Sequence, residues 1–187
     1  PKFGWFWYHK GYCELKVKEY EMAMKSFEAC YKKYPNGGSG PDKAGDAKNI
    51  SFNLYHKRSL LKWGEAAQGA KDYQLAIRMY RKFLAERSKK TGEDPYEKGA
   101  FYVNMAVCYF KLFKIPEGIE NLETAIKNKE VFPTPDQGIM AGFQSLVQAC
   151  IEKTNEQALM DFLDKNRADI TLEPFQMSPF GPIFMRL

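Results

Sequence analysis

"GEAAQGAKDYQLAIRMYRKF", residues 64–83, sets small residues and large rings at fixed distances. Its anchors Gly64, Ala76, Tyr80 and Phe83 are separated by 12, 4 and 3 residues. The same separations recur in two other sets: Gly11, Ala23, Phe27 and Cys30, and then Ala106, Gly118, Leu122 and Ala125. A bulky residue stands four positions before each set, at Trp7, Leu60 and Tyr102. Self-similarity at fixed offsets predicts an array of structural repeats.

These offsets suit a pair of antiparallel helices, because a small residue at the crossing lets the two backbones approach closely and large residues fill the space beside it. The pattern resembles the tetratricopeptide repeat, which runs bulky-x-x-Leu-Gly-x-x-Tyr, then Ala-x-x-x-Phe, then Pro. Pro35 stands where the first repeat would end. Three residues depart from the pattern: Lys10 and Glu14 replace Leu and Tyr in the first repeat, and Ala67 replaces Tyr in the second.

The distances between repeats exceed the usual period of about 34 residues. The anchors Gly11, Gly64 and Ala106 lie 53 and 42 residues apart. Residues 35–49, "PNGGSGPDKAGDAKN", are rich in Gly, Pro, Asn and Asp, which is typical of a loop. Residues 88–98, "SKKTGEDPYEK", contain an Asp-Pro pair that favours a helix start. This second passage resembles the longer, 42-residue variety of the repeat.

The resemblance implies an all-α fold, a right-handed superhelical array of about four antiparallel helix hairpins. We expect a repeat domain over residues 1–170, with hairpins at about 3–34, 48–90, 95–129 and 136–166 and a loop insertion at 35–47. The expected helices are 3–15, 18–34, 48–70, 72–90, 95–112, 115–129, 136–152 and 154–166. The fourth hairpin shows only apolar periodicity and a degenerate motif. Residues 171–187 are apolar and contain three prolines, so we expect an extended tail there.

Composition narrows the class of protein. The chain is 44% hydrophobic and 15% aromatic, which excludes an intrinsically disordered chain. No apolar run is long enough to span a membrane, so we expect no membrane-spanning helix. The net charge is +5 and is unevenly spread, with 11 basic and 6 acidic residues in 49–98 but 8 basic and 11 acidic in 99–187. This asymmetry suits an acidic partner near the middle, but it falls short of the basic stripe that specific nucleic-acid binding needs.

Residues that could carry catalysis or bind metal do not cluster. The four cysteines, Cys13, Cys30, Cys108 and Cys150, form no C-x-x-C pair, so we expect buried free thiols. Neither His9 nor His56 has another His or Cys at metal-ligand spacing. No two carboxylates stand out as an acid–base couple. We therefore expect no enzyme activity, no metal site and no cofactor in this chain.

The N-terminal stretch "KFGWFWYHKGYCEL", residues 2–15, is more aromatic than one buried helix face requires. Trp5 through Tyr8 spread around most of the helix circumference, as in an interior repeat with neighbours on both sides. We expect an upstream helix, another subunit or the folded-back C-terminal tail to cover them, and we expect the chain to be a segment of a larger protein. Self-association through the aromatic face or the tail is a further expectation.

The resemblance also implies a binding surface, since the first helices of such repeats line a concave groove that holds extended peptides or partner helices. The groove positions correspond to Trp5, Tyr8, Tyr12, Arg58, Leu61, Glu65, Val103, Val107, Phe110 and Lys111. Aromatic rings with isolated charges suit an apolar peptide with one or two ionic anchors. The alternative is that several of these residues pack between neighbouring first helices. The expected function is a protein–protein interaction scaffold; the alternative is a substrate-recruiting or regulatory module of an enzyme whose catalytic domain lies elsewhere.

Overall fold

The computed structural model describes residues 4–33, 50–87, 100–128 and 135–166, and every regular element within them is an α-helix. The helices are α1 (Gly4–Lys16), α2 (Tyr20–Lys33), α3 (Ile50–Gly69), α4 (Tyr73–Arg87), α5 (Ala100–Lys111), α6 (Ile115–Lys127), α7 (Pro135–Glu152) and α8 (Glu156–Asn166). They form two compact units, the first containing α1–α4 and the second α5–α8.

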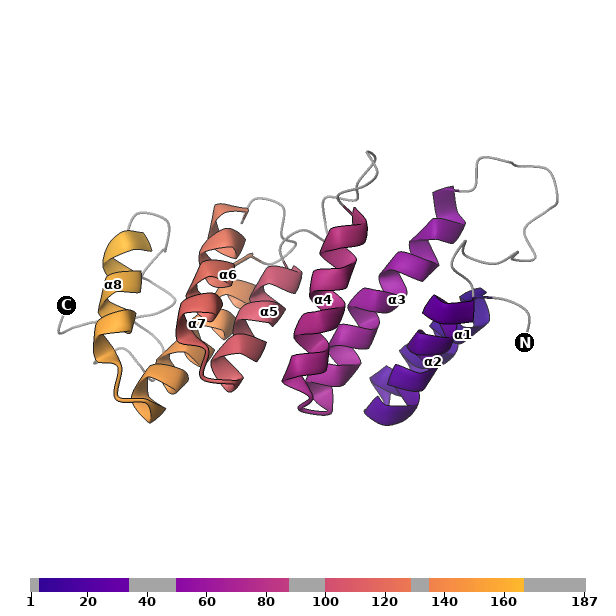
Figure 1. Cartoon of the computed structure of the whole chain (residues 1–187), viewed down its shortest axis with the longest axis horizontal. Coiled ribbons are helices and arrows are strands. Elements are labelled where there is room, and N and C mark those ends of the chain that lie inside the picture. Colours follow the sequence, from indigo (N-terminus) through magenta and orange to yellow (C-terminus); the bar gives the residue numbers. More distant parts are fainter. Residues whose placement is uncertain (1–3, 34–49, 88–99, 129–134, 167–187) are drawn as a thin grey trace. The chain divides into compact units, whose positions relative to one another are not determined.

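Consecutive helices pair into four hairpins over the described residues: α1 with α2, α3 with α4, α5 with α6, and α7 with α8 (Figure 1). The predicted all-α array of helix hairpins is therefore confirmed. Within the first unit, α3 also packs on α1 and α2, and within the second, α7 also packs on α5 and α6. The predicted loop at 35–47 and the predicted tail at 171–187 lie outside the described residues, and the handedness of the array stays a prediction.

All four hairpins turn in the same way. One non-glycine residue in each turn has a positive φ: 65° at Lys18, 63° at Lys71, 57° at Phe113 and 51° at Thr154. In the first turn the amide of Lys18 donates to the carbonyl of Leu15 at 3.1 Å, and the amide of Glu19 donates to that of Glu14 at 2.8 Å. The other three turns repeat both bonds. This is the Schellman ending, which satisfies carbonyls that the helix itself leaves open.

The shared turn explains why second helices begin later than predicted. The sequence predicted starts at 18, 72 and 154, whereas α2, α4 and α8 begin at Tyr20, Tyr73 and Glu156. A residue in the left-handed region ends one helix, and the next residue becomes the cap of the following one. Asp72 is such a cap, since its Oδ1 accepts a 3.0 Å bond from the amide of Leu75. Asn155 caps α8 through the amide of Ala158.

The small residues of the repeat mark very close contacts between paired helices. A Cβ atom at Gly11 would lie 2.9 Å from the ring of Phe27, and one at Gly64 would lie 2.5 Å from the ring of Tyr80. Both rings come from the second helix of the hairpin. In the third hairpin the arrangement is reversed, because Gly118 is on α6 and a Cβ there would lie 2.2 Å from the ring of Phe110 on α5. The predicted role of the small residues is thus confirmed by geometry.

The fourth hairpin shows why its motif is degenerate. Gly11, Gly64 and Ala106 each stand seven residues before the positive-φ residue of their turn, and Val147 takes that place before Thr154. A branched side chain at the crossing holds two helices further apart than glycine or alanine does. Accordingly α7 and α8 pack on each other less closely than the other pairs.

Each unit has its own apolar core. In the first unit Tyr8, Ala23, Phe27, Cys30 and Ala66 form a cluster that draws on α1, α2 and α3, with Trp7 and Trp63 packed partly against it. In the second unit a larger cluster draws on all four helices; its members include Phe110, Leu122, Phe143, Leu146 and Phe162. The repeats therefore hold together through rings and aliphatic side chains on the inner stripes of their helices.

Candidate functional site

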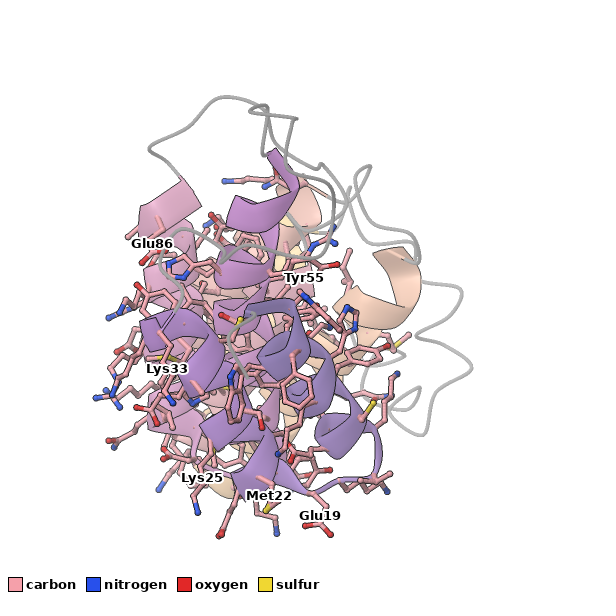
Figure 2. All side chains as sticks on the ribbon, turned by 90° about the vertical axis from the view of Figure 1, so that its right-hand side faces the viewer. Glu19, Met22, Lys25, Lys33, Tyr55 and Glu86 are labelled. Atoms are coloured by element: carbon pink, nitrogen blue, oxygen red, sulfur yellow. The ribbon has the colours of Figure 1, made fainter. Side chains whose placement is uncertain are left out.

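The first helices of unit 1 present neighbouring stripes of accessible side chains, which we call the α1–α3 face. Its residues recur at helical spacing, so that each helix contributes a single stripe. The stripe on α1 consists of Trp5, His9, Tyr12 and Lys16, and the stripe on α3 consists of Tyr55, Arg58, Lys62 and Glu65. The two helices are in contact. Figure 2 labels Tyr55, which lies across the unit from Lys33 and Glu86 on the second helices.

Aromatic rings form the part of the α1–α3 face nearest the start of α1. The exposed ring of His9 has three neighbours: its centroid lies 6.2 Å from that of Trp5, 5.5 Å from that of Tyr8 and 5.6 Å from that of Tyr55. All three pairs meet edge to face, the arrangement that aromatic quadrupoles favour. Tyr12, one turn further along, is 37% exposed. The face therefore offers rings whose positions are fixed by their neighbours.

The face carries three cations and one anion, of which Lys62 and Glu65 form an ion pair. The Nζ of Lys62 lies 2.8 Å from both carboxylate oxygens of Glu65. The Nζ of Lys16 lies 5.2 Å above the ring centroid of Tyr12, a cation–π contact. Arg58 stands between Tyr55 and Lys62 along α3 and is partly exposed. The face can thus offer a ligand aromatic surface with local charges beside it, of which the larger number are positive.

In the structure, the ten residues predicted for the groove fall into a buried group and an accessible group. Four of them, Tyr8, Leu61, Val103 and Phe110, expose 9% of their surface or less, so they belong to the packing between helices, as the alternative interpretation proposed. Six remain at least partly accessible: Trp5, Tyr12, Arg58, Glu65, Val107 and Lys111. The first four of these six come together on the α1–α3 face. His9 and Tyr55 were missed, although each lies one helical turn from a predicted residue on the same stripe.

The corresponding surface of unit 2 has a different chemistry. On α5, Val107 is partly buried and Lys111 is exposed, with Asn104 on the same stripe. The neighbouring stripe of α7 exposes two amide side chains, Gln144 and Gln148. This surface offers amides and short apolar groups where the α1–α3 face offers rings.

The departures of the first repeat from its motif are explained by a polar cluster between α1 and α2. Ser26 is buried on α2, and its hydroxyl donates to Oε2 of Glu14 at 2.6 Å. The Nζ of Lys10 donates to the hydroxyl of Ser26 at 3.2 Å and also binds Glu14 directly. Lys10 and Glu14 therefore replace the apolar Leu and Tyr of the motif with charges that satisfy each other and a buried hydroxyl.

A second cluster joins α2, α3 and α4 on the opposite side of unit 1. The ring of Tyr31 stacks on the ring of His56 with centroids 4.3 Å apart, and the Nζ of Lys82 lies 4.2 Å from the Tyr31 centroid. The hydroxyl of Tyr31 donates to Glu86, whose other carboxylate oxygen lies 3.7 Å from Nε2 of His56. Burial, with the hydrogen bond and charge of Glu86, raises the pKa of Tyr31 above its ordinary value. Through these contacts the cluster links α2 and α4, the second helices of the two hairpins of unit 1, to each other and to α3.

The prediction of buried free thiols is correct for three of the four cysteines. Cys30, Cys108 and Cys150 are buried and unpaired, whereas Cys13 is exposed on α1. Burial raises the pKa of Cys30 to about 11, although hydrogen bonds involving Ser59 and the backbone of Tyr8 partly offset it. Burial alone raises the pKa of Cys108 to about 12, and it raises that of Cys150 as well. The buried thiols therefore remain protonated and inert near neutral pH.

Among the residues that the structure describes, no group of His, Cys, Asp and Glu side chains is arranged to hold a metal ion. None of the eight described helices combines the length and the apolar character that crossing a membrane requires. The described helices present exposed faces.

Comparison with known families bears on those faces. The family model of the tetratricopeptide repeat matches residues 6–37 and 58–89, which correspond to the hairpins of unit 1. These two segments are similar to tetratricopeptide repeats. No curated protein and no solved structure gives a significant match. Tetratricopeptide repeats generally mediate protein–protein interactions and are typically non-catalytic modules, and the hairpins of unit 2 share the turn that the matched tetratricopeptide hairpins use.

Proposed function

We propose that this chain is an interaction scaffold whose first-helix faces bind a peptide or a partner helix. The observation that carries the proposal is the α1–α3 face, where Tyr12 and His9 are exposed beside the partly exposed Trp5 and Arg58. Tyr, Trp and Arg are the residues that most often dominate binding energy at protein interfaces. Rings held in place by their neighbours lose little conformational entropy when a ligand binds them.

The proposed contact residues are the accessible members of the predicted groove: Trp5, Tyr12, Arg58 and Glu65 in unit 1, and Val107 and Lys111 in unit 2. Each unit supplies its own surface, and the two surfaces differ in chemistry. We expect the aromatic surface of unit 1 to contribute most of the affinity, since amide and short apolar contacts of the kind found in unit 2 usually contribute less to binding.

The test is a peptide selection on the full chain, followed by affinity measurements with the selected peptides. We expect Tyr12→Ala to weaken binding by about tenfold or more, as truncation of a central aromatic contact commonly does. The matched control is Met22→Ala, because Met22 is a large, half-exposed apolar residue of the same unit on α2. Figure 2 shows Met22 at the end of the unit away from Tyr55. Selected peptides that bind both variants equally well would refute the proposed site.

A further inference from the structure

The α1–α3 face is an aromatic platform long enough for one turn of an extended peptide. Trp5 and Tyr12 are seven residues apart on α1, which corresponds to roughly 10 Å along the helix axis. A polyproline II helix advances about 9 Å in three residues. Residues i and i+3 of such a peptide would therefore rest near the two ends of the stripe, with the ring of His9 between them.

The charges of the face leave room for an apolar ligand, because its one carboxylate is already paired. Glu65 is the single acidic residue among the eight described residues of the face, and it is bound by Lys62. Lys16 lies over the ring of Tyr12 and so covers one side of it. Lys16 and Arg58 add positive charge beside the rings, and the surface left for apolar contact is the edge and face of His9 and the open part of Tyr12.

Proline-rich peptides are the ligands that aromatic platforms of this kind recognise. Proline fixes its own φ, so a segment with prolines at i and i+3 is already close to polyproline II and loses little entropy on binding. P-x-x-P segments dock into grooves lined by aromatic rings for this reason. One such segment is present in the chain itself: Pro179-Phe180-Gly181-Pro182, within the apolar stretch "MSPFGPIFM" of residues 177–185, outside the described residues.

We propose that the P-x-x-P segment at residues 179–182 of a second copy binds the α1–α3 face of unit 1. The proposal rests on the proposed function and names its ligand. The two prolines lie along the stripe from Trp5 to Tyr12, and Phe180 or Ile183 adds apolar contact beside them. The face belongs to the first two hairpins and the segment lies near the other end of the sequence, so a contact between two copies is head to tail.

The binding test uses a fluorescent synthetic peptide of residues 173–187 and the full chain carrying Pro179→Ala and Pro182→Ala, so that the protein does not compete with its own segment. Anisotropy titration should give saturable binding. A peptide with both prolines changed to alanine should bind at least about tenfold more weakly, and so should the normal peptide to a protein that also carries His9→Ala and Tyr12→Ala. The matched control, Met22→Ala in the same background, should change the affinity by less than about twofold.

Self-association is measured in parallel on the unmodified chain. Its mean mass in sedimentation equilibrium should rise with concentration, whereas the Pro179→Ala, Pro182→Ala protein should remain monomeric over the same range. Circular dichroism confirms that each variant keeps its helices. Equal binding of the proline and alanine peptides, or an unmodified chain that stays monomeric, overturns the proposal. If selected peptides still bind through Tyr12 in that case, the proposed function stands; if no peptide binds there, both fail.

Discussion

Adding one methyl group at Gly118 should destabilise unit 2, because Phe110 already occupies the space. A Cβ atom there would lie 2.2 Å from Cε1, 2.5 Å from Cδ1 and 2.8 Å from Cζ of the ring. Carbon atoms in contact prefer about 3.5–4.0 Å, so the ring would have to move by more than an ångström. The ring is 1% exposed and is part of the apolar core of unit 2, so any movement must displace its core neighbours. Overpacking of this kind costs typically about 1–3 kcal/mol.

A helix gains about 1 kcal/mol when alanine replaces glycine, and this gain opposes the clash. The approach of 2.2 Å is the closest of those at the three repeat glycines, so we expect the clash to cost about 2–3 kcal/mol, and Gly118→Ala to lower the free energy of unfolding by about 1–2 kcal/mol. The gain is similar at every helical glycine, so a series isolates the clash. Gly64→Ala, with 2.5 Å to the ring of Tyr80, should destabilise less, and Gly11→Ala, with 2.9 Å to the ring of Phe27, should be close to neutral.

Urea unfolding measures the change in the free energy of unfolding for each of the three glycine variants. All three tryptophans, Trp5, Trp7 and Trp63, belong to unit 1, so tryptophan fluorescence follows Gly11→Ala and Gly64→Ala. Far-UV circular dichroism follows Gly118→Ala in unit 2. Adding Phe110→Leu to Gly118→Ala should recover about 1 kcal/mol relative to the sum of the single changes, because the shorter side chain removes the clash. A Gly118→Ala protein as stable as the original, or a reversed order in the series, would refute the close approach.

Three further predictions concern the buried polar groups. Ser26→Ala should lower the free energy of unfolding by about 1 kcal/mol, because Glu14 loses a hydrogen-bond donor while its contact with Lys10 remains. An unchanged urea midpoint would contradict this prediction. A thiol reagent at neutral pH should label Cys13 quickly, whereas the other three thiols should react only on unfolding; two or more fast thiols would show that the burial is wrong. Stability should fall as pH rises above about 9, because the ordinary pKa of a thiol is 9.0 and the folded values are about 11 for Cys30 and about 12 for Cys108. In this range the folded thiols hold protons that the unfolded ones have lost, so each of the two thiols lowers the free energy of unfolding by about 1.4 kcal/mol per pH unit. Thermal or urea unfolding at a series of pH values measures this loss. A free energy of unfolding that stays level from pH 9 to 11 would argue against the raised thiol pKa values.

The hairpins could be predicted because small residues and rings at fixed offsets leave few alternatives to a close helix crossing. The exact ends could not. Lys18, Lys71 and Thr154 adopt a backbone conformation that sequence analysis associates with glycine or asparagine, so nothing in those residue types marked the turn. Three second helices were consequently predicted one or two residues too early.

The candidate site was harder to predict than the fold, because residues one helical turn apart can either pack against a neighbouring helix or face solvent. Tyr8 and Tyr12 stand one turn apart on α1, yet Tyr8 is packed against α2 and α3 while Tyr12 faces outward. Sequence alone does not say how far a neighbouring helix rotates toward either residue. The polar cluster at Ser26 was missed for a related reason: Lys10 and Glu14 form a recognisable i, i+4 pair, but their partner comes from another helix.

Although neighbouring hairpins within a unit also share core contacts, the identical turn in all four hairpins makes each hairpin a repeated cassette. Its two helices are tied by local hydrogen bonds whose pattern does not depend on the residue types used, whereas the segments that join successive cassettes differ in length. Protein engineers can therefore place an epitope tag or a protease site between cassettes and leave every helix pair intact. The same insertion inside a turn would separate the pair it joins.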